Sequence, residues 1–469
     1  MNEVTLEYDS GTILIKGIAN IPNAKYDPIR NCLRAEGLHY NQIIQLLNLK
    51  KIAYEDKVLD LIPFHHPLET ASPLNLRNYQ NEALKNWALE HRRGCIILPT
   101  GAGKTIVGLK AIEMVSSSSL VIVPTLDLIY QWETAISRYF NKIKVGQISA
   151  GREDLQAITI STYDSAYIKA SRLGNKFSLI IFDEVHHLGA PSYRSIAEIF
   201  VAPYRLGLTA TIEREDSMDQ EFPQLVGNIV YMENAYNLAK GKHIAEYEIE
   251  RRHVNMSPEE ETEYIKHTKI YRMCLKKIGI NMNTPNAFRR LIMLSSRSNL
   301  ARRAVLARNK ASNIALNSST KLDELRQILL ENRGIKTIIF TQHNKMVYKI
   351  SNEFLIPFIT HKSNKVERQD ILDGFRSGRF MALVTSKVLD EGVDVPDAEL
   401  GIIVSGSGSR REFIQRLGRL LRPKSDSRKG RLIEIISSRT QEVMSSRKRR
   451  EILNRPSLQK GDSEYFKQP

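Results

Sequence analysis

The chain has 469 residues, which is too long for one ordinary hydrophobic core and suggests roughly three domains. Hydrophobic residues make up 42% of the chain, and no apolar run reaches the ~20 residues of a membrane-spanning helix. The first residues do not have the pattern of a secretory signal. We therefore expect an intracellular protein without membrane contact, located in the cytoplasm or nucleoid, or in the nucleus if the source is a eukaryote. Lysine and arginine number 68 against 52 acidic residues, and this net charge of +16 favours a polyanionic partner without identifying one.

The first 70 residues have the pattern of a small α+β domain. Apolar residues alternate from Val4 to Lys16 around a Ser-Gly turn, which predicts a β-hairpin. We expect helices at Pro28–Ala35 and Tyr40–Leu47. Prolines at positions 63, 67 and 73 interrupt regular structure afterwards, so we place the first domain boundary there and assign residues 1–70 to this unit.

Two series of short apolar runs follow, each run succeeded by polar or helical sequence. This alternation is typical of βαβ units with a buried parallel sheet, so it predicts two similar α/β lobes, at residues 71–232 and 319–469. The predicted strands are Cys95–Leu98, Leu120–Val123, Ile158–Ser161, Leu179–Phe182 and Leu206–Leu208 in the first lobe, and Thr337–Phe340, Met381–Val384, Gly401–Val404 and Leu432–Ile436 in the second.

Residues 233–318, between the lobes, have helical rather than strand signals. Ser257 and Glu260 have the spacing of a capping box, with a proline at the first helical position. No acidic residue occurs from Thr284 to Leu322. The same stretch contains the basic residues Arg289, Arg290, Arg297, Arg302, Arg303, Arg308, Lys310 and Lys321. We therefore expect a basic helical insertion, although a solvated charged face would have the same composition.

The three cysteines, Cys32, Cys95 and Cys274, lie far apart in the sequence. Their spacing supports neither a disulfide framework nor a zinc or iron-sulfur site. An iron-sulfur cluster is excluded in particular, because it needs four thiolates.

The sharpest chemical signal is the sequence Leu-Pro-Thr-Gly-Ala-Gly-Lys-Thr at residues 98–105, between a predicted strand and a helix. In this context glycines let backbone N–H groups face phosphates, the lysine supplies a point charge and the final threonine can hold Mg²⁺. The usual pattern has glycine at position 98, where leucine stands. The candidate ATP-binding residues are Thr100, Gly101, Ala102, Gly103, Lys104 and Thr105.

Two carboxylates, Asp183 and Glu184, follow the predicted strand Leu179–Phe182. Alone, such a pair is usually surface charge. At the carboxyl edge of the sheet that carries the phosphate loop, Asp183 can anchor magnesium and Glu184 can deprotonate the attacking water. Together with Lys104 they predict an ATPase.

The motif order resembles that of superfamily 2 helicases and translocases over most of residues 74–440. The resemblance rests on Asp183–His186, Thr209–Thr211 and the run from Gln415 to Arg422. It implies two RecA-like lobes with ATP between them, and Gln415, Arg419 and Arg422 of the second lobe in catalytic roles. A guanidinium at the γ-phosphate neutralises the charge that develops during transfer.

The resemblance assigns further positions. Arg77 and Gln80 match the segment that contacts adenine, and Gly392 and Asp394 match positions that face the nucleotide. The positions that match contacts to the nucleic-acid backbone are Thr125, Thr162, Thr341 and Thr385.

Within superfamily 2 the chain is most similar to the xeroderma pigmentosum group B (XPB) helicases of the compact archaeal type. The triplet Arg214, Glu215, Asp216 resembles a motif linked in that family to strand opening. The resemblance also implies a damage-recognition role for the first domain and a thumb-like role for the basic insertion. Its arginines Arg289, Arg290 and Arg297 would contact DNA phosphates.

The expected activity is that of an ATP-dependent DNA helicase or double-stranded DNA translocase of 3′ to 5′ polarity, acting in repair or transcription on duplex, forked or bubble DNA. The family implies a structure-specific nuclease or a repair and transcription complex as partner. Two alternatives stay open: an RNA helicase or restriction-type translocase, and a nucleotide-regulated DNA-binding scaffold that recruits a nuclease.

Overall fold

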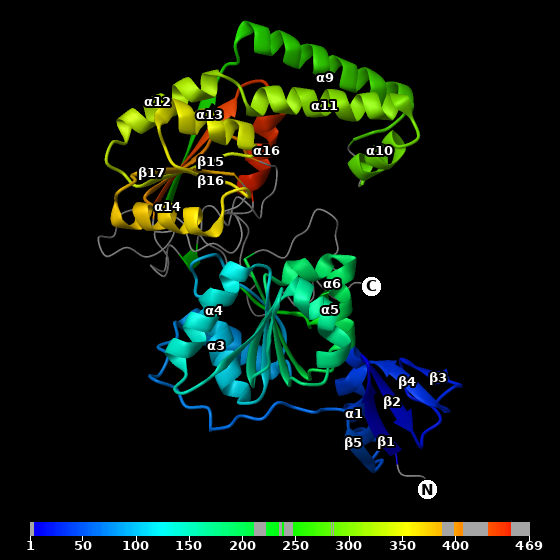
Figure 1. The fold of residues 1–469 in the computed structure, drawn as a ribbon. Helices are drawn as coiled ribbons and strands as arrows, with labels where there is room; N and C mark the ends of the chain where they lie inside the picture. The colour runs from blue at the N-terminus through cyan, green and yellow to red at the C-terminus, as the bar shows by residue number, and fades with distance from the viewer. Residues whose placement is uncertain are drawn as a thin grey trace. The chain divides into compact units, whose positions relative to one another are not determined.

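The computed structural model describes residues 4–210, 222–233, 237–238, 247–282, 284, 286–386, 398–406 and 430–451. The chain divides into two compact units, with the boundary between Asn234 and Ala235. The first unit contains a small sheet domain and an α/β lobe, lobe 1 (Figure 1). The second contains another α/β lobe, lobe 2, and a projecting group of helices within residues 258–316 that we call the thumb (Figure 1).

The N-terminal domain is a five-stranded sheet in the order β3-β4-β2-β1-β5. Strands β1 and β2 form the predicted hairpin, in which Gly11 adopts φ +100° at the turn. Apolar side chains of the sheet and of α1 make the core. The elements are β1 (Val4–Asp9), β2 (Thr12–Lys16), β3 (Ala24–Asp27), β4 (Cys32–Glu36), the 3-10 helix η1 (Gly37–His39), α1 (Tyr40–Leu49) and β5 (Tyr54–Lys57).

The helix expected at Pro28–Ala35 is wrong. The Asp27 carboxylate instead accepts hydrogen bonds from the backbone N–H groups of Ile29 and Arg30, at 3.0 and 3.2 Å, and closes a turn. Strand β4 then pairs antiparallel with both β2 and β3. The conformation of this segment is therefore determined by strand pairing on both sides and by the burial of three apolar side chains, Cys32, Leu33 and Ala35.

Lobe 1 is built on an eight-stranded sheet in the order β13-β6-β12-β11-β7-β10-β8-β9, parallel apart from the β8–β9 pair. Helices α3 and α4 lie on one face and α5 and α6 on the other (Figure 1). The elements are α2 (Asn78–Leu89), β6 (Arg93–Ile97), α3 (Lys104–Val115), β7 (Ser119–Val123), α4 (Leu126–Tyr139), β8 (Val145–Ser149), β9 (Arg152–Asp154), β10 (Ile158–Thr162), α5 (Tyr163–Leu173), β11 (Leu179–Asp183), η2 (Val185–Gly189), α6 (Pro191–Ile199), β12 (Tyr204–Thr209), α7 (Phe222–Leu225) and β13 (Ile229–Met232).

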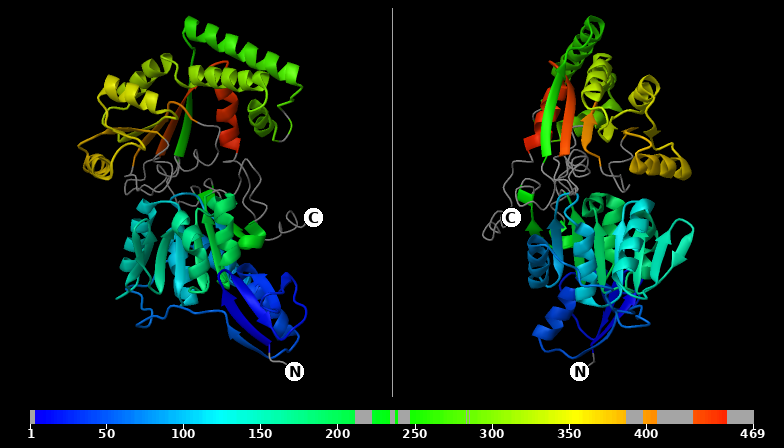
Figure 2. Two further views of the ribbon diagram at one scale, coloured as in Figure 1. Left: turned by 45° about the vertical axis from the view of Figure 1, so that its right-hand side comes forward. Right: turned by 90° about the vertical axis from the view of Figure 1, so that its left-hand side faces the viewer.

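The N-terminal domain packs directly against lobe 1 (Figure 2). The Tyr8 hydroxyl donates to the carbonyl of Ser171 in α5 at 2.8 Å, and η1 contacts α6. Asn175 donates a side-chain hydrogen bond to the carbonyl of Val58 at 3.0 Å and accepts one from the N–H of Asp60 at 3.0 Å through its own carbonyl. A Cβ on Gly37 would lie 2.2 Å from the carbonyl oxygen of Ile199, so only glycine permits this approach.

Lobe 2 has a six-stranded sheet in the order β14-β19-β18-β15-β17-β16, and every pair in it is parallel. Helices α12 and α13 contribute to the apolar cluster on one face. The elements are β14 (Tyr247–Val254), α12 (Thr320–Glu331), β15 (Thr337–Phe340), α13 (Asn344–Phe354), β16 (Phe358–Ile359), α14 (Lys365–Ser377), β17 (Ala382–Thr385), β18 (Leu400–Ile403), β19 (Gly430–Ser437) and α16 (Gln441–Glu451).

Strand β14 corrects the expectation that residues 233–318 are purely helical. It pairs with β19 over its whole length and forms one edge of the lobe 2 sheet. Its sequence, Tyr-Glu-Ile-Glu-Arg-Arg-His-Val, is rich in charge. Charged side chains are typical of edge strands because they discourage pairing with other chains. Because such a strand lacks an apolar run, a prediction based on apolar runs misses it.

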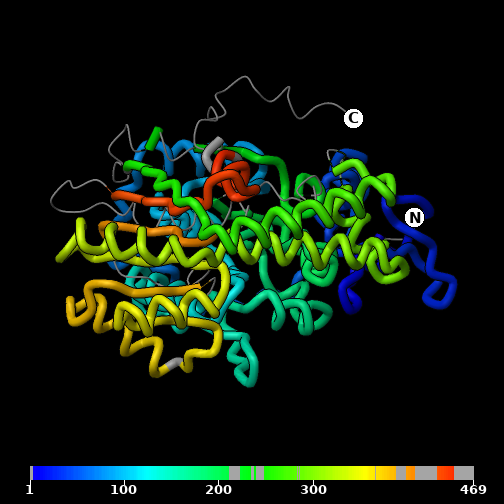
Figure 3. Tube along the Cα trace, turned by 90° about the horizontal axis from the view of Figure 1, so that it is seen from above, coloured from blue at the N-terminus to red at the C-terminus, as the bar shows by residue number. Residues whose placement is uncertain are grey.

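The thumb consists of α9 (Pro258–Ile278), α10 (Ala287–Ser295) and α11 (Asn299–Leu316). Helices α9 and α11 lie side by side along most of their length (Figure 3). The predicted capping box is present: Ser257 Oγ accepts from the N–H of Glu260 at 3.3 Å, and the Glu260 carboxylate accepts from the N–H of Ser257 at 3.2 Å. The interface between the two long helices is lined with alanines, which allows them to pack closely.

No helix in the described parts of the chain combines the length and apolar character that a bilayer crossing requires.

Candidate nucleotide and nucleic-acid sites

The phosphate loop connects β6 to α3. Gly101 and Gly103 adopt φ +84° and +80°, in the left-handed region that glycine favours. A Cβ on Gly103 would lie 2.6 Å from the side-chain nitrogen of Gln80. The two glycines therefore determine the path of the loop, which leads directly into the N-terminus of α3.

Two groups of this loop are available to a ligand. Thr100 Oγ1 is buried and has no hydrogen-bond partner among the described residues. Lys104, the first residue of α3, donates only a long hydrogen bond of 3.4 Å to the carbonyl of Leu98 within the described chain. A buried hydroxyl and an ammonium group beside a helix N-terminus suit the oxygens of a phosphate chain.

Gln80, which resemblance assigns to adenine, supports the phosphate loop in this structure. Its amide nitrogen donates to the carbonyl of Ala102 at 3.0 Å, and the hydroxyl of Tyr79 donates to the same carbonyl at 2.8 Å. Its amide oxygen accepts from the N–H of Arg77 at 2.9 Å and caps α2. One N–H of the amide remains for a base, so adenine recognition through Gln80 stays a prediction.

Asp183 is the last residue of β11 and is buried. Its carboxylate accepts hydrogen bonds from the indole N–H of Trp132 at 2.8 Å and from the N–H of Glu184 at 3.0 Å. Burial raises the pKa of Asp183 to about 6, and the neighbouring charge of Glu184 adds to this effect; the Trp132 hydrogen bond and the charge of Lys104 oppose it. A divalent cation would compensate the buried charge, so the donor set fits Mg²⁺ bound by Asp183 together with Thr105 of α3.

Glu184 follows in the left-handed conformation, with φ +50°. Its carboxylate accepts from the hydroxyl of Thr209 at 3.3 Å, and this hydroxyl lies 3.1 Å from Nδ1 of His186. A non-glycine residue at positive φ is uncommon. Here the turn places two successive carboxylates at the edge of the sheet that carries the phosphate loop.

The sheet topology explains why these residues meet. Strands β6, β12 and β11 are neighbours, with Ile97 opposite Thr209 and Asp183 opposite Leu208. The phosphate loop, Thr209 and the two carboxylates therefore share one carboxyl edge of a parallel sheet. This arrangement can hold a nucleoside triphosphate with its metal and activate water for attack on the terminal phosphate.

Trp132 has a role that the sequence analysis missed. Its buried indole N–H donates to the Asp183 carboxylate and so holds the group proposed to bind the metal. A Cβ on Gly108 of α3 would lie 2.4 Å from the Trp132 ring, so glycine at this position makes room for it. A glycine inside a helix that directly follows a phosphate loop was the available signal.

Thr125 lies just after β7, and Thr162 is the last residue of the neighbouring strand β10. Their side chains accept hydrogen bonds from the N–H groups of Leu128 and Ser165, at 3.4 and 3.2 Å, and cap α4 and α5. Both therefore stand at the N-terminus of a helix on the edge that also carries Asp183. Helix N-termini of this kind bind phosphate groups, so DNA contact here stays a prediction that this placement favours.

In lobe 2, Thr341 and Thr385 come together. Thr385 ends β17 and pairs with Phe340, and the N–H of Thr341 donates to the carbonyl of Thr385 at 2.9 Å. Both hydroxyls donate within their own loops, to the carbonyls of His343 and Ser386. Both side chains are buried in this structure, so a contact to DNA would require these loops to rearrange or to use their backbone N–H groups.

The three thumb arginines assigned to DNA are all exposed. Arg289 and Arg290 lie in α10, and Arg297 lies just before α11. Arg290 also donates to the hydroxyl of Thr284 at 2.6 Å. Their exposure suits contact with phosphates.

Eight predicted site residues lie outside the described residues, so their placement stays a prediction: Arg214, Glu215, Asp216, Gly392, Asp394, Gln415, Arg419 and Arg422.

A phosphate loop after β6, two acidic residues at the end of β11 on the same edge of the sheet, and a second parallel-sheet lobe define the class of bilobal helicase-like nucleoside triphosphatases. The crystal structure of the Pyrococcus furiosus Hef helicase domain has this fold: it aligns with a TM-score of 0.54 at 21% identity, covering 79% of this chain and 97% of that one. The predicted fold class is confirmed.

Family models identify the particular family. Residues 6–58 match the xeroderma pigmentosum group B helicase damage recognition domain, residues 73–214 match the type III restriction enzyme, res subunit, and residues 308–456 match the ERCC3/RAD25/XPB C-terminal helicase. The chain is 44% identical over 448 residues to the DNA 3′-5′ translocase XPB2 of Sulfurisphaera tokodaii, covering 96% of this chain and all of that one. The chain belongs to the XPB family of helicases, as the sequence motifs predicted.

Longer relatives match only in part. The DNA 3′-5′ helicase XPB of Kineococcus radiotolerans is 28% identical over 78% of this chain and 60% of its own length. The general transcription and DNA repair factor IIH helicase/translocase subunit XPB2 of Arabidopsis thaliana is 28% identical over 77% of this chain and 46% of its own. The chain thus spans the compact archaeal relative completely and about half of the plant protein.

Proposed function

We propose that this chain is a DNA-dependent ATPase that moves along or unwinds double-stranded DNA with 3′ to 5′ polarity, in DNA repair or transcription. The observation that carries the proposal is the lobe 1 edge, where Lys104, Asp183 and Glu184 surround one phosphate-binding loop. The XPB relatives, which are named as DNA translocases and helicases, support the choice of DNA.

Each group has a proposed task. Lys104 and the backbone N–H groups of the loop bind the outer phosphates. Thr105 and Asp183 would hold Mg²⁺, which would supply charge neutralisation at the phosphates. Glu184 accepts the proton of the attacking water. Arg419 and Arg422 of the second lobe neutralise the charge that develops on the γ-phosphate, so that hydrolysis requires both lobes.

Membership in the XPB family also supports proposals for the DNA contacts and for the partner proteins. The exposed thumb arginines and the helix N-termini at Thr125 and Thr162 bind backbone phosphates, which makes binding strongly dependent on salt. The N-terminal domain recognises altered DNA. The names of plant relatives support membership in a repair or transcription assembly, and a structure-specific nuclease is a further candidate partner.

The decisive experiment compares ATP hydrolysis with no nucleic acid, duplex DNA, single-stranded DNA and RNA, and adds a strand-displacement assay on forked DNA. We expect duplex or forked DNA to stimulate hydrolysis most. Preferential stimulation by RNA would instead support an RNA helicase. DNA binding without any hydrolysis above that of the Lys104→Ala variant would support the scaffold alternative.

A further inference from the structure

A polar cavity of about 430 Å³ lies in the second unit, where the thumb meets lobe 2. Helices α9 and α11 contribute Tyr264, Tyr271, Arg308 and Ser312 to its wall, and the segment after β15 contributes Gln342 and His343. The volume falls in the range of ~300–1,000 Å³ that small-molecule sites occupy. None of the roles described above accounts for this cavity.

Its position in the sheet is one where ligands bind in α/β folds. From β15 the chain continues to β16, toward one edge of the sheet, whereas from β18 it continues to β19, toward the other edge. Neighbouring strands with connections in opposite directions form a switch point, and a crevice opens at their carboxyl ends. Gln342 follows β15 and Gly406 follows β18, and both line the cavity.

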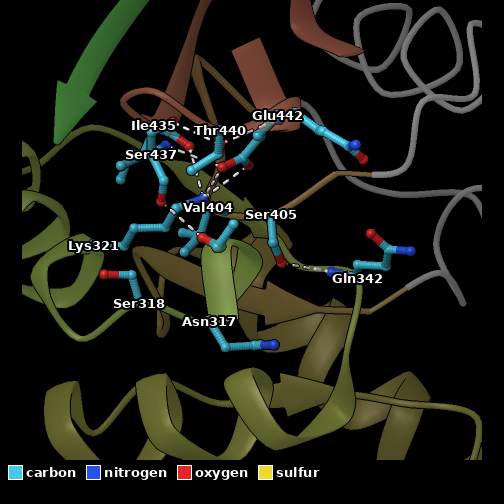
Figure 4. A network of polar contacts seen from close by, with 12 residues as sticks. Asn317, Ser318, Lys321, Gln342, Val404, Ser405, Ile435, Ser437, Thr440 and Glu442 are labelled. Atoms are coloured by element: carbon cyan, nitrogen blue, oxygen red, sulfur yellow. Dashed lines mark hydrogen bonds and ion pairs between the residues drawn. The ribbon is translucent and has the colours of Figure 1, made fainter. Parts of the chain in front are cut away.

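The wall offers a side-chain oxygen that the described part of the chain leaves without a hydrogen-bond partner. The N–H of Gln342 donates to Ser405 Oγ at 2.9 Å, which ties the ends of the two strands together (Figure 4). The side-chain oxygen of Gln342 is buried and has no partner among the described residues. Such a group requires a ligand or water, because an unsatisfied buried oxygen is costly.

The charge of the wall favours a ligand that carries an anionic group. Glu442 also lines the cavity, but both of its carboxylate oxygens accept hydrogen bonds from the buried Lys321 ammonium, at 2.8 and 2.7 Å (Figure 4). Its negative charge is therefore compensated. Arg308 stacks over the Phe288 ring, 4.1 Å from its centroid, and supplies a positive charge to the wall.

We propose that this cavity binds a nucleotide, with the base at the tyrosines and the Gln342 amide and the phosphate at Arg308. Tyrosine rings stack with any base, and an amide pairs with base edges. The thumb, which contributes one wall of the cavity, also carries the exposed arginines proposed to bind DNA phosphates, so the favoured source is an unpaired nucleotide of the bound strand. A free nucleotide has the same chemistry. The inference rests on the proposed function, because it needs DNA bound at the thumb.

The inference can be tested with one variant that fills the cavity and one that removes its polar group. Ser312→Trp introduces a large ring on the lining face of α11, and Gln342→Leu removes the unused amide at nearly constant volume. Leu306→Trp, on an exposed position of the same helix, is the matched control. Binding is measured with single-stranded and forked DNA that carries one 2-aminopurine, whose fluorescence reports a base leaving its stack, and all variants are first compared by thermal unfolding.

We expect Ser312→Trp and Gln342→Leu to weaken binding of the DNA about tenfold and to remove the fluorescence change, with the control unaffected. To test a free nucleotide as the ligand, dAMP is titrated into the Lys104→Ala chain with and without Ser312→Trp. Binding of dAMP that is lost when Ser312→Trp is added identifies the cavity as a free-nucleotide site. Unchanged DNA and dAMP binding in both cavity variants would overturn the inference. Failure of DNA to stimulate ATP hydrolysis by the unaltered chain would instead refute the proposed function.

Discussion

Lobes 1 and 2 share a parallel-sheet architecture, yet each carries a lysine near the carboxyl edge of its sheet in a different state. Lys104 in lobe 1 is only partly buried and donates one long hydrogen bond within the described chain. Lys321 in lobe 2 is fully buried and donates to Glu442 and to the carbonyls of Val404 and Ile435 (Figure 4). The same side chain is therefore available to a ligand in one lobe and saturated by protein acceptors in the other.

The neighbouring acids differ in the same way. Asp183 is buried beside another carboxylate, and this burial raises its pKa, so the residues around it compensate its negative charge incompletely. Glu442 accepts from Lys321 and from the N–H of Ser437. A buried charge that the protein compensates incompletely indicates a ligand-binding site, whereas a buried charge that is fully paired indicates a structural role. The Lys321–Glu442 pair joins α12 to α16 and thereby supports the base of the thumb.

The largest expected effect is a loss of ATP turnover, and it tests whether lobe 2 takes part in ATP hydrolysis. Arg419→Ala should lower ATP turnover by about 10³ to 10⁵-fold while ATP binding is retained, because the guanidinium acts on charge that develops during hydrolysis. Single-turnover hydrolysis and nucleotide binding are measured together. Arg333→Ala, an exposed arginine of the same lobe, is the control. Weakened binding with normal turnover would contradict the assignment.

Lys104→Ala should reduce turnover by on the order of 10² to 10³-fold, since it removes a charge at the outer phosphates. Because Lys104 has no strong protein partner in the described chain, the thermal stability of the variant should stay close to that of the unaltered protein. Lys110→Ala on the same helix, whose partner is Glu113, is the control for turnover. A large loss of stability would show that the two lysines are more alike than the structure indicates.

Lys321→Met should have the opposite profile. It leaves the buried Glu442 carboxylate without its cation, which costs about 3–5 kcal/mol of unfolding free energy. Denaturant unfolding of the whole chain should show a destabilised second unit. The double variant Lys321→Met, Glu442→Leu should recover much of the loss, because it removes both charges. An unchanged single variant would mean that the pair does not stabilise lobe 2.

The raised pKa of Asp183 predicts a pH dependence of magnesium-nucleotide binding. A metal ligand must be deprotonated, so affinity for Mg²⁺-ADP should rise about tenfold from about pH 5 to about pH 7 and then level off. The sign for the metal-free protein is the reverse: protonation of Asp183 contributes stability at low pH that is lost as pH rises through about 6. Titrations with ADP in EDTA provide the control, and a flat profile with magnesium would refute this explanation.

The smallest effect concerns the edge of lobe 1. Thr162→Ala should cost about 1 kcal/mol of stability because the N-cap of α5 is lost, and Thr162→Ser should restore it. The salt dependence of DNA binding should be the same in both variants, since the hydroxyl carries no charge. A changed salt slope would show that this edge binds DNA in a different way from the one proposed.

Much of lobe 1 was predictable because its signals are contiguous in the chain. The phosphate loop lies within residues 98–105, and each of the predicted strands there overlaps an observed one. Strands β8, β9, β13 and β16 were not anticipated. Short strands and strands at the edges of a sheet carry little apolar periodicity, so their existence depends on the neighbours that they pair with.

The sequence by itself determined the class of chemistry and the family, because the backbone of a phosphate loop depends on residues next to one another. Only the tertiary structure decided that Trp132 serves Asp183, that Lys321 pairs with Glu442 121 residues away, and that the thumb and lobe 2 enclose a polar cavity. Local conformation follows from local residues, whereas the partner of a buried polar side chain depends on which distant segments pack beside it.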